Sequence, residues 1–145
     1  MDDIEYELTV TLNPCPLSVI NKASDQTIEY EIGNEGETSN PYSFSQSKAC
    51  NWPEVTTITW DPPQPSFIRH DEVNKVFILE RVENNDDAGS YTISVTNTAT
   101  YKYDVNNPTM TRELSETTMY TFIIKARCEA TNMRTTTDFP NPILY

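Results

Sequence analysis

Strict alternation of apolar and polar positions is the dominant pattern along this chain. In residues 4–12 the side chains of Tyr6, Leu8, Val10 and Leu12 alternate with glutamates and threonines. Because successive side chains of a strand point to opposite faces, this alternation predicts a strand with one buried face and one face in water. No segment favours a helix.

Similar alternation predicts more strands, and prolines fall between them, as expected for a residue that cannot donate to a sheet ladder. The further strands are expected near residues 26–32, 42–46, 55–60, 75–82, 89–103 and 113–127. Short strands at this spacing are typical of all-β sandwiches. We therefore predict an all-β fold, an antiparallel sandwich of about seven to eight strands.

The first predicted strand and the last long one share a template. Tyr6, Leu8, Val10, Leu12 and then Cys15 correspond to Tyr120, Phe122, Ile124, Ala126 and then Cys128. One interpretation is that the chain carries the last strand of a preceding repeat, and another is that it lends this strand to a neighbour. The alternative is that edge strands of any sandwich look alike. The expected domains are a terminal strand at 1–14, a sandwich at 15–128, and a linker or docking arm at 129–145.

The three cysteines cannot all pair within one monomer, and their spacing does not suggest a zinc site. If Cys15 and Cys128 are equivalent positions, Cys50 is the natural partner of Cys15, and Cys128 is left for another repeat or another copy. A Cys50–Cys128 pair and three free thiols are the alternatives. A disulfide would imply an oxidising, extracellular setting.

A second motif is Asp87-Ala88-Gly89-Ser90-Tyr91-Thr92-Ile93, which follows Pro65-Ser66-Phe67-Ile68-Arg69-His70-Asp71 and Lys75-Val76-Phe77-Ile78. Together these pieces resemble the Ig-like and cadherin-like tandem repeats of large protist and bacterial surface proteins. The resemblance implies an Ig-like sandwich with a tyrosine corner made by Asp87, Gly89 and Tyr91, in which the Tyr91 hydroxyl bonds to backbone upstream and Gly89 allows a tight approach. It also implies a non-enzymatic module that works in adhesion or in building fibres.

Charge narrows the possible partners. Twenty-two acidic residues against ten basic ones give a net charge of −12, which disfavours binding to nucleic acid and to anionic lipid. No stretch is apolar enough to insert into a membrane. Adjacent repeats or other copies of the chain are the expected partners, and glycans are a second possibility.

Candidate chemistry is sparse. His70 is the only histidine, it is expected in a turn, and no nucleophile motif accompanies it, so we predict no enzyme. The run from Glu83 to Asp87 could offer oxygen ligands to calcium, although EF-hand spacing is missing and a solvated turn is the alternative. No other cofactor is expected. Trp52 and Tyr42, with the tyrosines at 101, 103 and 145, are candidates for an exposed aromatic platform that stacks on sugars, whereas Trp60 is expected in the core.

Overall fold

The computed structural model describes residues 18–47, 50–102 and 111–128, and all its regular structure apart from one 3-10 turn is β-strand. The strands are β1 (Ile20–Lys22), β2 (Gln26–Glu31), β3 (Glu37–Thr38), β4 (Phe44–Gln46), β5 (Glu54–Asp61), β6 (Ile68–Asp71), β7 (Val76–Leu79), β8 (Gly89–Lys102) and β9 (Thr111–Lys125). The turn is η2 (Asn85–Asp87), between β7 and β8. The all-β prediction is therefore confirmed, with nine strands in these residues instead of seven to eight.

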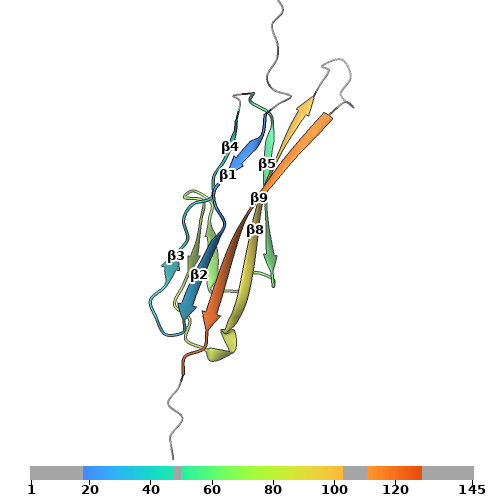
Figure 1. The fold of residues 1–145 in the computed structure, drawn as a ribbon. Helices are drawn as coiled ribbons and strands as arrows, with labels where there is room; N and C mark the ends of the chain where they lie inside the picture. The colour runs from blue at the N-terminus through green and yellow to red at the C-terminus, as the bar shows by residue number, and fades with distance from the viewer. Residues whose placement is uncertain (1–17, 48–49, 103–110, 129–145) are drawn as a thin grey trace, which may run out of the picture.

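Two layers face each other across one core (Figure 1). The first layer is a four-stranded sheet in the order β2-β9-β8-β5, and the second is a three-stranded sheet in the order β3-β7-β6. The expectation of a wholly antiparallel sandwich is wrong at one place, because β2 runs parallel to β9. The other ladders are antiparallel.

The second layer continues into a short ladder between β1 and β4. After β3, backbone N–H groups of Ser39 and Tyr42 still donate to carbonyl oxygens of the β7 region, at 2.9 and 3.0 Å. The chain then leaves β7 and pairs with β1, with Ile20 opposite Gln46. The chain from β1 to β2 thus changes layers: β1 pairs with the extension of the second layer, and β2 belongs to the first layer.

Alternating side chains from both layers form the main core. On β8 and β9 the inward positions are almost wholly buried, including Ile93, Val95, Tyr120 and Phe122 at 0 to 1% exposure. Phe77 of β7 packs opposite them, with its ring 5.1 Å from that of Tyr120. Trp60 packs against this core from β5, edge-on to Phe77. A smaller cluster of Ile20, Trp52 and Ala99 lies apart from it.

Gly36 is required by the close approach of neighbouring strands within the second layer. A Cβ at this position would lie 2.3 Å from the carbonyl oxygen of Leu79, which is closer than side chains tolerate. Gly36 directly precedes β3, and β3 pairs with β7 through Leu79. We infer that any larger residue here would push β3 away from β7.

Candidate functional site

The loop before β8 makes the hydrogen bond expected of Tyr91. The Tyr91 hydroxyl donates to the carbonyl oxygen of Asp87 at 3.0 Å. Burial, and then the charge of Asp87, raise the pKa of Tyr91, so the hydroxyl remains a donor at neutral pH. The expected role of Gly89 is wrong, because a Cβ there would make only ordinary contact with the Tyr91 ring, at 3.7 Å.

The two asparagines of the acidic run from Glu83 to Asp87 make structural hydrogen bonds. The Asn84 side chain caps η2 by accepting from the backbone N–H of Asp86 at 3.0 Å. Asn85 accepts from the backbone N–H of Arg127 and donates to its carbonyl oxygen, at 2.9 and 3.3 Å. Within the described residues, no three side chains of the His, Cys, Asp and Glu types are grouped to hold a metal. The calcium prediction stays untested.

The expected exposed platform of Trp52 and Tyr42 is not formed. Tyr42 is 7% exposed and Trp52 is 6% exposed, and they belong to different clusters. Tyr42 lies in the main core, where its hydroxyl is 3.1 Å from Nε2 of His70 and its ring stacks on the histidine. His70 itself lies in β6, so the expected turn at this position is wrong.

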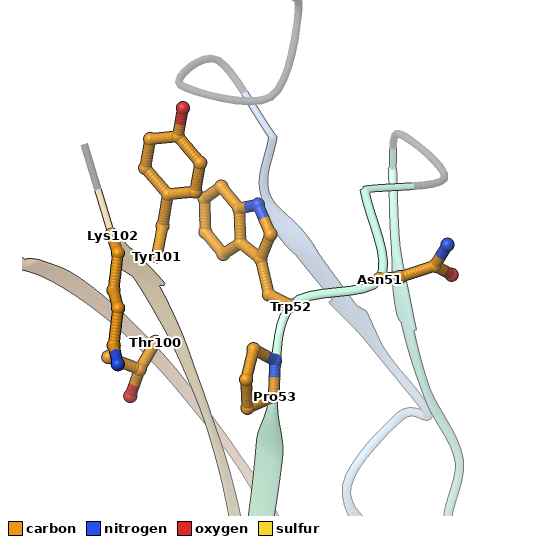
Figure 2. A pocket seen from close by; sticks show the side chains of 6 residues that line it. All are labelled: Asn51, Trp52, Pro53, Thr100, Tyr101 and Lys102. Carbon is orange, nitrogen blue, oxygen red and sulfur yellow. The ribbon is translucent and has the colours of Figure 1, made fainter. Parts of the chain in front are cut away.

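Trp52 instead forms an aromatic pair with Tyr101 of β8. The ring centroids are 4.9 Å apart and the planes are inclined by 23°. Figure 2 shows these two rings side by side at the wall of a cavity of about 490 Å³, which Asn51, Pro53, Thr100 and Lys102 complete. Nε1 of Trp52 is buried and makes no hydrogen bond to any described group. Tyr101 was among the platform candidates, but its pairing with Trp52 could not be read from the sequence, because the two residues lie 49 positions apart.

A second, more polar cavity of about 290 Å³ opens beside the inner face of β5. Its lining residues are Tyr42, Phe44, Glu54, Thr56, Glu72, Lys75 and Asn97. The Glu54 carboxylate accepts hydrogen bonds from the side-chain amides of Gln46 and Asn97. Oδ1 of Asn97 is buried and lacks a described partner. Burial, followed by the charge of Glu72, raises the pKa of Tyr42.

The two cysteines that the structure describes, Cys50 and Cys128, are not paired with each other. Cys128, which follows β9, is exposed and free, so the alternative Cys50–Cys128 pair is not formed. Cys50 packs at the edge of the Trp52 cluster. Cys15 lies outside the described residues, and the Cys15–Cys50 disulfide stays a prediction. The expected assembly strand with Tyr6, Leu8, Val10 and Leu12 also lies outside them, as do the proposed linker and arm at 129–145.

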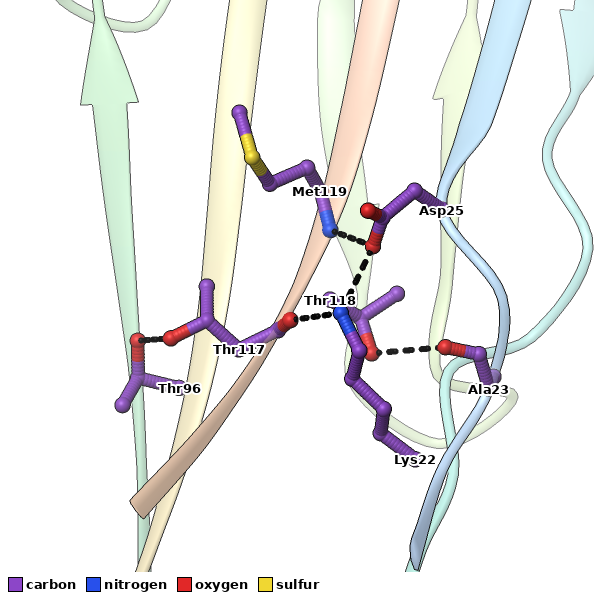
Figure 3. A network of polar contacts seen from close by, with 7 residues as sticks. All are labelled: Lys22, Ala23, Asp25, Thr96, Thr117, Thr118 and Met119. Atoms are coloured by element: carbon purple, nitrogen blue, oxygen red, sulfur yellow. Dashed lines mark hydrogen bonds and ion pairs between the residues drawn. The ribbon is translucent and has the colours of Figure 1, made fainter.

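One side of the four-stranded sheet is closed by side chains where β2 has not yet begun. The carboxylate of Asp25 accepts from the backbone N–H of Met119 at 2.9 Å, and Lys22 donates to the carbonyl oxygen of Thr117 (Figure 3). Lys22 and Asp25 are themselves paired at 3.1 Å. Thr118 also donates to the carbonyl oxygen of Ala23. These side chains satisfy edge groups of β9 that a neighbouring strand would otherwise satisfy.

The opposite side of the same sheet is open among the described residues. β5 is the last strand there and pairs only with β8 in the ladder.

In the part of the chain that the structure describes, there is no helix capable of crossing a membrane. The chain matches no protein-family model and none of the curated proteins.

Proposed function

We propose that this protein is a non-enzymatic structural module that works outside the cell, as one link in a linear array of sandwiches joined head to tail. The array would be a tandem surface stalk or a fibre. The partners would then be adjacent repeats or other copies of the chain.

The path of the chain through the sandwich carries this proposal. β1 lies toward one end of the long axis, and β9 ends at the other (Figure 1). A module that is entered at one end and left at the other can be strung into a line without folding back. The division into four and three strands is also that of Ig-like sandwiches, which commonly occur at cell surfaces.

The shared template of residues 4–12 and β9 gives the array its joint. The sandwich already contains a strand of this template, β9, between β2 and β8. In this proposal residues 4–12, which share the template, bury their apolar face in a neighbouring sandwich. The exposed thiol of Cys128 is available for a covalent link to the next unit.

Deletion of residues 1–13 tests this proposal. The truncated chain should keep the thermal unfolding temperature of the full chain, because in this proposal the deleted strand packs on a neighbouring unit and not on its own sandwich. Sedimentation velocity should show concentration-dependent assembly of the full chain and a monomeric truncated chain. A full chain that stays monomeric at every concentration would contradict the proposal, and so would a truncated chain that unfolds.

The Trp52–Tyr101 cavity favours carbohydrate binding as a second candidate function. Aromatic rings offer flat apolar faces on which sugar rings stack. Because Trp52 is buried, the partly exposed ring of Tyr101 would present this face, and Asn51 and Lys102 could supply hydrogen bonds at the rim. A titration with soluble glycans, followed by tryptophan fluorescence, tests it. Trp60 also contributes to the signal, so Tyr101→Ala serves as the control that should abolish any shift. No shift at millimolar glycan would exclude this candidate.

A further inference from the structure

The free side of β5 is the longest open strand edge among the described residues. β5 has eight residues, whereas the other outer strands β2, β6 and β3 have six, four and two. An open edge presents unpaired backbone N–H and C=O groups, which form a template for another strand. Its length is enough for a stable ladder with one added strand.

β5 also lacks the features that usually protect an edge. Between Glu54 and Asp61 its six residues, Val55 to Trp60, contain no charge and no proline, although these are the common means of blocking strand addition. The β2 edge carries Glu29 and Glu31, and β6 carries Arg69 and Asp71. The outward side chain of Val55 is 63% exposed. The centre of β5 is thus an uncharged edge in a strongly acidic protein.

We propose that this edge binds residues 4–12 of a second copy of the chain as an added strand. This inference rests on the proposed function and identifies the surface that would receive the joining strand. The nine residues of the segment match the eight of β5 in length. Main-chain hydrogen bonds would hold the added strand, as in other cases of β-augmentation.

The two faces of the added strand suit their surroundings. Ile58 and Trp60 point to the inner side of β5 and are only partly buried. The Tyr6, Leu8, Val10 and Leu12 face would lie beside them and cover apolar surface that water now reaches. Glu5 and Glu7 would then share the outer face with Thr57 and Thr59. Asp61 also lies on this face, so the pairing registers that place a glutamate directly opposite Asp61 are disfavoured.

Hydrogen exchange of the full chain at low and high concentration tests the proposal. With assembly, exchange should slow at the amides of 55–60 that face the open edge and stay unchanged in β2. A synthetic peptide of residues 4–12 should produce the same protection when added to the dilute chain. The same peptide with proline in place of Leu8 is the control, because proline cannot donate to the ladder.

A pair of matched variants locates the acceptor. Thr56→Lys puts a charge on the inner side of the β5 edge and should weaken binding of the peptide at least about tenfold. Thr27→Lys makes the same change on exposed β2 and should leave binding unaltered. Because both variants change the net charge equally, a general electrostatic effect would weaken binding in both.

The outcomes separate this inference from the array itself. Two results would contradict β5 as the acceptor and leave the proposed array intact. The first is assembly that depends on residues 1–13 without protection of β5. The second is a Thr56→Lys variant that binds the peptide as well as Thr27→Lys does. If the peptide protects β5 but the full chain never assembles, the array is wrong. Protection of β5 in a monomeric full chain that disappears on deletion of 1–13 would mean pairing within one chain, which overturns the second copy as donor.

Discussion

The two sides of the four-stranded sheet differ in how their edge groups are satisfied. On the β9 side, Asp25 and Lys22 bond to backbone groups of Met119 and Thr117, and β2 pairs with residues 120–125, so the edge is covered from Thr117 to Lys125. On the β5 side, no described group pairs with the outer edge. Threonine-rich strands of similar local sequence thus have different surroundings. Backbone groups at the edge are satisfied within the fold on the β9 side, whereas on the β5 side they are left without a described partner.

The largest expected effect comes from truncating buried side chains in the two regions. Phe122 of β9 is fully buried, and Phe122→Ala should lower the free energy of unfolding by about 3–5 kcal/mol. Ile58 of β5 is only partly buried, so Ile58→Ala should cost about 1–2 kcal/mol. Urea denaturation measures both. Equal losses would mean that β5 is buried as deeply in solution as β9.

Tyr91→Phe should have an intermediate effect. The substitution removes the hydroxyl that donates to the Asp87 carbonyl and leaves that acceptor without its partner. A loss of about 1–2 kcal/mol is expected in urea denaturation. Gly89→Ala is the contrasting variant, and it should be much milder because the new Cβ fits. Unchanged stability in Tyr91→Phe would contradict a structural role for this hydrogen bond.

Asp25→Asn tests the closed side through pH. The hydrogen bond from the Met119 backbone, followed by that from Lys22, lowers the pKa of Asp25 below its ordinary value. A carboxyl with a lowered folded-state pKa stabilises the fold above its unfolded pKa, and this stabilisation is lost as pH falls through the folded value. Because the side chain is 54% exposed, the variant should lower Tm by roughly 2 °C or less at pH 7.

The pH profile distinguishes this effect from a simple packing change. The difference in Tm between wild type and Asp25→Asn should begin to shrink below about pH 4, the ordinary pKa of an aspartate, and disappear below the lowered pKa of the folded state. A difference that stays constant down to pH 2 would show that the charge of Asp25 does not contribute.

The smallest effect is expected at the outer face of the open edge. Val55 is 63% exposed and points away from the core, so Val55→Ala should change the free energy of unfolding by less than about 0.5 kcal/mol. A clear destabilisation in the dilute protein would indicate that Val55 is covered there, which would remove the contrast between the two sides.

Much of the strand pattern could be predicted because long alternating segments have a local signal. The predictions near 26–32, 55–60, 89–103 and 113–127 correspond to β2, β5, β8 and β9. The strands β1, β3 and β6 were missed because two to four residues are too few to show a period, and neighbouring strands impose their conformation. His70 was assigned to a turn for this reason.

The candidate sites were less predictable. Tyr42 and Trp52 were expected together on the surface, since the sequence pattern did not readily place either of them in a core. The structure buries Tyr42 against His70 and Phe77, and it pairs Trp52 with Tyr101. Each of these contacts joins residues at least 28 positions apart, and no local pattern specifies such a contact.

The sequence by itself determined that the chain is all-β and which side chains of the long strands face inward, because alternation follows from strand geometry alone. Only the tertiary structure decided that β2 runs parallel to β9, that Lys22 and Asp25 close one side of the sheet, and that β5 leaves the other side open. These features depend on which strands become neighbours. That choice is made by burial and hydrogen bonding between distant segments, and the period of any one strand does not carry it.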